Sequence, residues 1–122
     1  MKILFLGDIV GRAAREAVID ELPTLRRDKD IDFVVVNGEN AAGGFGITET
    51  IANSLFDAGV DVITLGNHVW DQRETLTHID REPRLLRPAN YPANTPGKGA
   101  GLFTTERGEQ VLIITVQGQL YI

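Results

Sequence analysis

The sequence contains no cysteine, only two histidines and few basic side chains. Of its 122 residues, 12 are Lys or Arg and 17 are Asp or Glu, so the net charge is −5. Without cysteine the chain has no disulfide framework, thiolate metal site or cysteine nucleophile, which excludes zinc-finger and papain-like proteins. The acidic balance leaves no basic stripe for phosphate backbones, so we expect no stable binding to nucleic acid.

Long apolar runs are also absent. Residues 1–8 carry one positive charge and an apolar run that is too short for the core of a signal peptide. The other apolar runs are strand-sized, so we expect no membrane-spanning segment and a cytoplasmic protein. The apolar share of 43% is nevertheless too high for a disordered chain, and the length suits one domain with its own core.

Three short apolar runs, at residues 3–6, 33–36 and 60–65, predict strands. They are rich in β-branched residues, as is typical of strands that are buried on both faces. The stretches between them have helical spacing and are long enough for parallel crossovers. The sequence therefore predicts an α/β fold that begins β-α-β-α-β with a parallel sheet.

Two helices are expected in the crossovers. In the first, apolar residues recur at helical spacing as far as Leu22, and Pro23 is expected to break or restart the helix. The second is expected to begin at Thr48, whose hydroxyl suits an N-cap, and to end at Gly59. Both helices would then pack against the same sheet.

The later part of the chain contains further apolar pieces. Leu85 with Leu86, and residues 111–116, extend the first sheet or begin a second one. Residues 88–101 between them are rich in Pro, Asn and Gly and predict a long surface loop. Residues 119–122 predict a last short strand. Nothing in this pattern divides the chain into two domains.

Each of the first three strands is followed by a glycine and then by polar side chains. The three junctions are Gly7-Asp8, Gly38-Glu39-Asn40 and Gly66-Asn67-His68. In a parallel sheet these ends lie at one edge, where ligands bind. One acidic residue after a strand usually caps a turn, but three such junctions favour a metal site. Carboxylate, amide and imidazole ligands suit manganese, iron or zinc, and a pair of such ions can bind a phosphoryl group.

These junctions, read as blocks 7–11, 37–46 and 65–71, resemble those of the calcineurin-like metallophosphoesterases and specifically of their YmdB-like bacterial branch. Glu39 stands where most members carry Asp, and this points to the branch. The resemblance covers essentially the whole chain. It implies a two-sheet αββα sandwich, of which residues 1–122 are the N-terminal part of a single domain. Because family members are considerably longer, we expect the chain to be truncated, either as a fragment or as an early-terminated product.

The resemblance also implies an activity and roles for the site residues. Asp8 would bind one ion, Glu39 would bridge two, Asn67 would bind the second, and Asn40 would be a further ligand or a phosphate contact. His68 would contact the substrate and act as the general acid. The implied cofactors are two divalent or trivalent ions, iron or manganese first, with zinc or magnesium as alternatives. The implied reaction is the hydrolysis of phosphodiesters, notably 2′,3′-cyclic nucleotides, by attack of metal-bound hydroxide.

The chain departs from the family pattern in two places. Val10 stands where many members carry a histidine, and the histidines with which the family completes its site are missing. The second histidine, His78, matches none of them and is expected to face solvent on a helix. With oxygen ligands alone, we expect the 122-residue chain to bind metal weakly and to have little or no activity.

Other residues near the junctions each have two possible roles. Gly44, in the glycine-rich stretch 43–46, is either part of a phosphate-binding nest or of a flexible turn. Trp70 is expected to pack at the edge of the core rather than to stack on a base. Asp71 and Glu74 have capping-box spacing, so Asp71 is expected to be an N-cap rather than a metal ligand.

Two further functions fit the same sequence. The first is a non-catalytic regulatory or interaction protein that forms a homo-oligomer through the exposed strand 111–116, since a free edge strand can pair with another chain. The second is a nucleotidase acting on monoesters, because two-ion sites do not by themselves distinguish monoesters from diesters. Metal content separates the first alternative from an enzyme, and substrate profiling separates the second from a phosphodiesterase.

Overall fold

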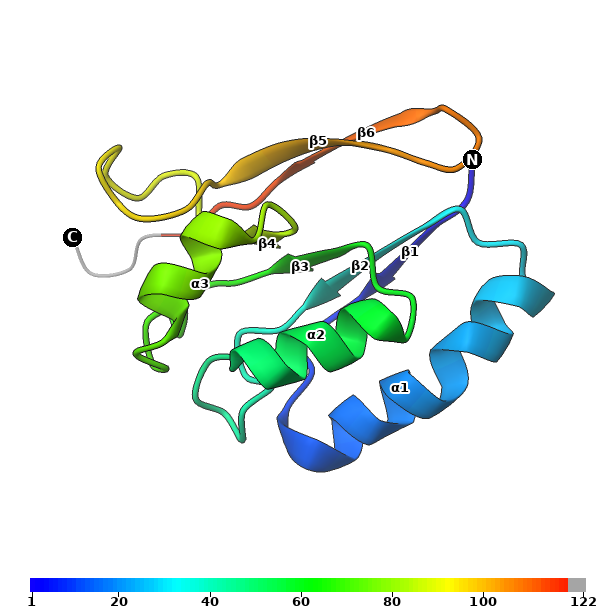
Figure 1. The fold of residues 1–122 in the computed structure, drawn as a ribbon, viewed down its shortest axis with the longest axis horizontal. Coiled ribbons are helices and arrows are strands. Elements are labelled where there is room, and N and C mark those ends of the chain that lie inside the picture. The colour runs from blue at the N-terminus through cyan, green and yellow to red at the C-terminus, as the bar shows by residue number, and fades with distance from the viewer. Residues whose placement is uncertain (119–122) are drawn as a thin grey trace.

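The computed structural model of the protein describes residues 1–118 and has three layers (Figure 1). A parallel sheet of four strands, in the order β1-β2-β3-β4, lies between two helices on one side and an antiparallel hairpin on the other. The strands of the parallel sheet are β1 (Ile3–Leu6), β2 (Phe33–Asn37), β3 (Val62–Thr64) and β4 (Leu85–Leu86). The hairpin consists of β5 (Ala100–Thr104) and β6 (Gln110–Ile114), and the helices are α1 (Gly11–Asp28), α2 (Glu49–Asp57) and α3 (Thr75–Arg81).

The predicted α/β fold with an initial parallel sheet is confirmed. Leu85 and Leu86 extend the first sheet, and most of the strand predicted at 111–116 forms β6, which pairs with β5 in a second sheet but ends at Ile114. The predicted loop 88–101 is correct up to residue 99, but residues 100 and 101 belong to β5. The strand predicted at 119–122 lies outside the described residues. Within residues 1–118, no helix has the length and apolar character needed to cross a membrane.

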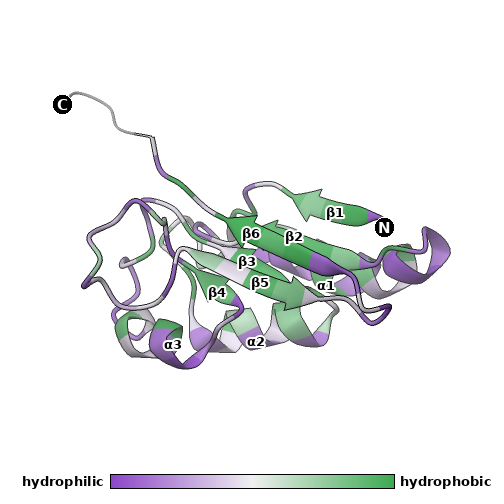
Figure 2. Cartoon of the chain, turned by 90° about the horizontal axis from the view of Figure 1, so that it is seen from above, coloured by the Kyte–Doolittle hydropathy of each residue, from purple (hydrophilic) through white to green (hydrophobic). Residues whose placement is uncertain are grey.

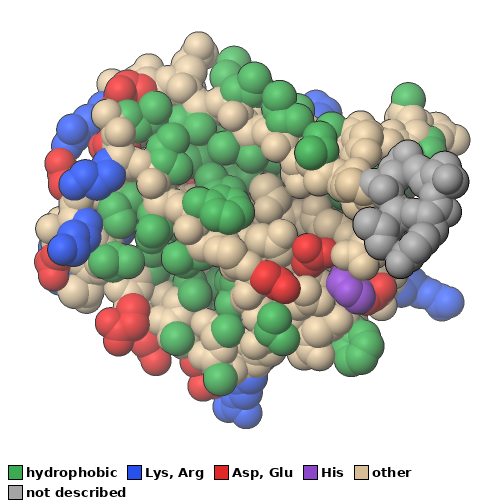
Figure 3. Space-filling view, turned by 180° about the vertical axis from the view of Figure 1, so that it is seen from behind, with side chains coloured by type: hydrophobic (Ala, Val, Ile, Leu, Met, Phe, Trp, Pro, Cys, Tyr) green, Lys and Arg blue, Asp and Glu red, His purple; other side chains and the backbone are tan. Residues whose placement is uncertain are grey.

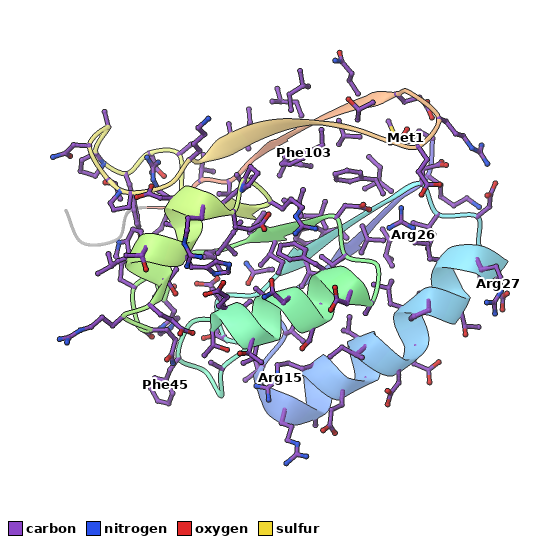
Figure 4. The ribbon with its side chains drawn as sticks, in the orientation of Figure 1. Met1, Arg15, Arg26, Arg27, Phe45 and Phe103 are labelled. Carbon is purple, nitrogen blue, oxygen red and sulfur yellow. The ribbon has the colours of Figure 1, made fainter. Side chains whose placement is uncertain are left out.

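Strand β2 is buried on both faces because it lies between two hydrophobic cores. Val34 and Val36 pack into the larger core, together with residues of α1 and α2. Phe33 and Val35 pack into a smaller core under the hairpin, where the ring centroids of Phe33 and Phe103 are 6.0 Å apart. Figure 4 shows Phe103 between the hairpin and the parallel sheet, and the strands of both sheets are largely coloured hydrophobic in Figure 2.

Strand β1 is an edge strand, so the prediction that it is buried on both faces is wrong. Among residues 1–118 it pairs only with β2. Leu4 and Leu6 pack against the core on the helix side. Ile3 and Phe5 are exposed, and Phe5 retains 62% of its accessible surface. Strand order, which the sequence pattern does not specify, causes this difference.

Helix α1 continues through Pro23, where the sequence predicted a break. Proline removes one helical hydrogen bond and normally costs ~3 kcal/mol in a helix interior. Tertiary contacts flank it on both sides. Leu22 is buried in the core, and Arg26 donates to Asp61 Oδ2 at 2.7 Å and to the Gly59 carbonyl at 2.6 Å. These contacts hold the last turn of α1 in helical conformation despite the proline.

Helix α2 has the predicted start and end. Thr48 is the N-cap, and its Oγ1 accepts a hydrogen bond from the Ile51 amide at 3.2 Å. The C-cap is Ala58, and Gly59 follows it with φ of +114°, a conformation that favours glycine.

Replacing Thr48 by alanine is expected to lower the free energy of unfolding by about 1 kcal/mol, because the Ile51 amide loses its acceptor. Urea unfolding followed by circular dichroism measures this change. Thr48→Ser retains the hydroxyl and serves as the control, which should stay close to wild type. Equal losses in the two variants would show that the Thr48 methyl group, not the cap, carries the stability.

The start of helix α3 and the exposure of His78 on it both differ from the predictions. It begins at Thr75, its N-cap is Glu74, and no side chain caps it, so Asp71 is not the N-cap that was predicted. His78 was predicted to face solvent but is only 4% exposed. Thr75, His78 and Ile79 share the buried face of the helix, as their spacing of three and four residues allows. Trp70 packs against the larger core, as predicted.

Candidate metal centre

The three polar junctions meet at the carboxyl edge of the parallel sheet. Strands β1, β2 and β3 run parallel, and their registers align Leu6 with Val36 and Asn37 with Thr64. Backbone hydrogen bonds join the junctions directly, since the Ile9 amide donates to the Asn37 carbonyl at 3.2 Å. Figure 3 shows carboxylates and a histidine gathered on the face of the molecule opposite to that seen in Figure 1.

Glu39 is partly buried at this edge, and its carboxylate is only half satisfied. Its Oε1 accepts from Asn37 Nδ2 at 3.3 Å, but its Oε2 is buried and has no hydrogen-bond partner. It lies directly against Gly66, where an ideal Cβ would be 2.7 Å from the Glu39 Cδ. A buried, unpaired carboxylate oxygen costs roughly 1–3 kcal/mol or more. Glu39 therefore fits the role of a metal ligand, because a bound cation would be the missing partner of Oε2.

Asp8 and Asn40 form a pair beside Glu39. The Asn40 Nδ2 donates to both carboxylate oxygens of Asp8 at 2.9 Å. The Asn40 backbone is itself fixed, because its carbonyl accepts from the amides of Gly11 at 3.2 Å and of Gly44 at 2.9 Å. The pair thus places a carboxylate and an amide together, which are ligands that hard cations accept.

Gly44 takes part in the turn that follows Asn40. Its φ is +91°, and its amide is the donor to the Asn40 carbonyl. This amide is therefore engaged within the loop, and Gly43 and Gly44 lie in a turn. A role for Gly44 in binding phosphate stays a prediction.

The third junction places Asn67 and His68 after Gly66. Asn67 is exposed at the edge of the sheet. The His68 Nδ1 lies 2.6 Å from Oδ2 of Asp71, which is the shortest contact of the histidine that the structure gives. Asp71 therefore pairs with His68 instead of capping α3.

Two residues of the site were not identified from the sequence. Asn37 donates to Glu39, and its own Oδ1 accepts from the Glu39 amide at 3.2 Å. The Tyr91 hydroxyl donates to Gln117 Oε1 at 2.7 Å. Burial, with a smaller contribution from the Glu39 charge, raises the pKa of Tyr91 above its usual value. The position of Asn37 immediately before the Gly38-Glu39 junction was a usable signal, whereas Tyr91 lies in a distant loop.

The donor set at this edge consists of oxygen ligands. Among residues 1–118, no three His, Asp or Glu side chains converge closely enough to hold an ion by themselves. The edge offers two carboxylates, Asp8 and Glu39, together with the amides of Asn40 and Asn67. Oxygen donors of this kind suit manganese, iron or magnesium better than metals that prefer thiolates.

A helix-covered parallel sheet under a second sheet, with these donors at its carboxyl edge, defines a protein of the metallophosphoesterase type. Residues 4–122 match the family described as YmdB-like protein, and the chain belongs to this family.

Among its relatives is the 2′,3′-cyclic-nucleotide 2′-phosphodiesterase of Bacillus subtilis (strain 168). The two are 44% identical over 122 residues, which are 100% of this chain and 46% of the relative. A hypothetical protein from Thermus thermophilus has a similar structure, with a TM-score of 0.89, 39% identity, and coverage of 98% of this chain and 46% of that one. A phosphatase from Mycoplasma pneumoniae gives a TM-score of 0.86 with 32% identity, over 97% and 43% of the two chains. The chain thus spans less than half the length of these relatives.

Proposed function

We propose that residues 1–122 form the N-terminal part of a single metallophosphoesterase domain, and that their polar edge belongs to the active site of a metal-dependent phosphodiesterase. The observation that carries this proposal is the buried Glu39 Oε2 without a partner, at the edge where Asp8, Asn40 and Asn67 also lie. The name of the Bacillus subtilis relative supports 2′,3′-cyclic nucleotides as the substrates.

The residues divide into those that hold metal and those that act on the substrate. Asp8, Glu39 and Asn67 would hold two ions, with iron or manganese as the first choice, and Asn40 would hold an ion or contact the phosphate. When bound, such ions neutralise charge on a phosphoryl group and lower the pKa of water. Asn37 orients Glu39 through its amide. The bound ions would give the acidic chain a local positive charge that attracts an anionic ester.

His68 would supply the proton that the departing ribose oxygen needs. Because a carboxylate only accepts hydrogen bonds, the contact with Asp71 requires the proton of Nδ1. Nε2 is then the ring nitrogen left to face a substrate. Because Nδ1 keeps its proton for Asp71, donation from Nε2 requires the doubly protonated ring. Nε2 would then pass its proton to the departing oxygen, which leaves as a hydroxyl group, and one phosphate ester bond stays intact.

Turnover measurements test the proposed activity directly. The 122-residue chain is incubated with Mn²⁺ and either 2′,3′-cyclic AMP or bis(p-nitrophenyl) phosphate. We expect slow hydrolysis that depends on both Mn²⁺ and protein. Glu39→Gln is the control, because it keeps the shape of the side chain and removes its charge. Hydrolysis no faster than with Mn²⁺ in buffer, or undiminished hydrolysis by the Glu39 variant, would contradict the proposal.

A monoester substrate is the second candidate. The Mycoplasma pneumoniae neighbour is described as a phosphatase, and the donor set alone does not distinguish monoesters from diesters. Parallel assays with p-nitrophenyl phosphate and 3′-AMP decide between them. The diesterase assignment predicts faster turnover of the diesters, and faster turnover of the monoesters would replace it with a nucleotidase.

A non-catalytic interaction protein is supported by the exposed apolar residues along β1 and β6. Ile3, Phe5, Ile114 and Val116 line a groove of about 410 Å³ between the two sheets at their open side. Metal analysis after purification with Mn²⁺ separates this function from the enzyme. Stoichiometric metal favours the phosphodiesterase, and a metal-free protein that dimerises favours the interaction protein.

A further inference from the structure

His68 and Asp71 form a close side-chain pair within one turn. The distance between His68 Nδ1 and Asp71 Oδ2 is 2.6 Å, and the two side chains are 37% and 32% exposed. The Asp71 amide also donates to the His68 carbonyl at 3.1 Å, so backbone and side chain are joined in the same turn. The carboxylate is thus placed by the fold at one particular ring nitrogen.

The loop before α2, at residues 45–47, packs against the turn that carries His68 and Asp71. Gly46 has φ of +73°, and an ideal Cβ there would lie 2.8 Å from the His68 carbonyl oxygen and 3.3 Å from Asp71 Cβ. Gln72 Nε2 donates to the Phe45 carbonyl at 2.7 Å, which joins the two loops next to the pair. The loop before α2 and the turn after β3 therefore pack without space for a side chain between them.

The turn is also anchored on its far side. The buried Thr75 Oγ1 donates to the Ile47 carbonyl at 3.1 Å, directly after the glycine-rich loop. Figure 4 labels Phe45 at the tip of this loop, outside the body of the molecule, while the backbone of the loop stays against the neighbouring turn. The chain that follows the His68–Asp71 pair is therefore joined to the loop 45–47 at two points, Gln72 and Thr75.

We propose that Asp71 is a positioning residue for His68. Its carboxylate accepts the proton of Nδ1, fixes the orientation and tautomer of the ring, and leaves Nε2 for the substrate. The role of Nε2 in proton donation rests on the proposed phosphodiesterase function. The orientation and tautomer of the His68 ring do not rest on that function. The position of the ring and its role in catalysis can therefore be tested separately.

Nitrogen-15 NMR of the histidine rings tests the geometry in the 122-residue chain without substrate or metal. The chain has two histidines, and spectra are recorded at pH about 9, where an ordinary imidazole is neutral. We expect His68 to carry its proton on Nδ1 in the wild type and mainly on Nε2 in Asp71→Ala. The resonances of buried His78 should be unchanged and report that the variant is folded. A His68 tautomer that is the same in both proteins would overturn the proposal.

Two glycine variants test whether packing of the loops maintains the pair. Gly46→Ala would place its methyl group against the His68 carbonyl, whereas a Cβ at Gly43 meets nothing within 4 Å. The φ angles of +73° and +65° are similar, so both variants place an L residue at a positive φ. We expect His68 to lose the Nδ1–H form in Gly46→Ala only. Equal spectra in the two variants would show that the loop contact does not hold the pair.

Hydrolysis rates then test what the position of the His68 ring contributes to the reaction. If Mn²⁺-dependent hydrolysis is present, Asp71→Ala is expected to reduce turnover of 2′,3′-cyclic AMP about tenfold and that of bis(p-nitrophenyl) phosphate by less than about threefold, because only the ribose oxygen needs a proton to leave. Equal losses on the two substrates would contradict a positioning role. A wild-type chain without hydrolysis would count against the proposed function, while the tautomer result would still decide the position of the ring.

Discussion

Replacing His68 by alanine is expected to slow hydrolysis of 2′,3′-cyclic AMP about 100-fold and to leave Mn²⁺ binding unchanged. General acid catalysis contributes this factor or more when the leaving group is an alkoxide. His68 is not among the residues that would hold the ions, and its Nδ1 is occupied by Asp71. Initial rates and Mn²⁺ binding measured on the same samples give both quantities.

The leaving group supplies the control for this prediction. The p-nitrophenolate ion is stable without a proton, so His68→Ala should slow bis(p-nitrophenyl) phosphate by less than about tenfold. A loss of the same size with both substrates would assign His68 to binding of the phosphate instead of proton donation. An unchanged rate with the cyclic nucleotide would remove His68 from the mechanism.

The second large effect is expected at Gly66. Replacing Gly66 by alanine would place a methyl group where the Glu39 carboxylate now lies, so the carboxylate must move away from the edge. Saturation with Mn²⁺ at about 100 times its dissociation constant should stabilise the wild type by ~2.7 kcal/mol. We expect Gly66→Ala to lose most of this stabilisation. Urea unfolding with and without Mn²⁺ measures it.

Gly7 offers a matched control for Gly66. It stands at the equivalent junction of β1, immediately before Asp8, but a Cβ at Gly7 would meet nothing within 4 Å. Gly7→Ala should therefore retain the stabilisation by Mn²⁺. Full stabilisation of Gly66→Ala would mean that the position of the Glu39 carboxylate is irrelevant to metal binding.

The strands and their common edge could be predicted because they depend on local pattern. Short β-branched runs with helical stretches between them indicate parallel strands, and parallel strands end at one edge. The exposure of β1 could not be predicted, since it depends on the order of the strands. The unbroken helix at Pro23 depends on contacts of Arg26 with residues far along the chain. The burial of His78 likewise depends on which face of α3 meets the core.

Parts of the candidate site could be predicted for the same reason, and other parts could not. The junctions are readable in the sequence because each polar group directly follows a strand. Asp71 was assigned to a cap because its spacing to Glu74 fits one, yet its spacing to His68 fits a side-chain pair equally well. The Tyr91 hydroxyl, in the loop before β5, lies 3.5 Å from the Gly66 carbonyl oxygen, and no local pattern indicates that contact. The contact between Gly66 and Glu39 requires the folded chain.

Mn²⁺ titration followed by electron paramagnetic resonance shows directly whether the edge around Glu39 binds metal. Free Mn²⁺ gives a sharp six-line signal that broadens when the ion is bound by protein. We expect the 122-residue chain to remove Mn²⁺ from this signal and Glu39→Gln to remove far less at the same concentration. Equal loss of the free signal with both proteins, or no loss with the wild type, would contradict it.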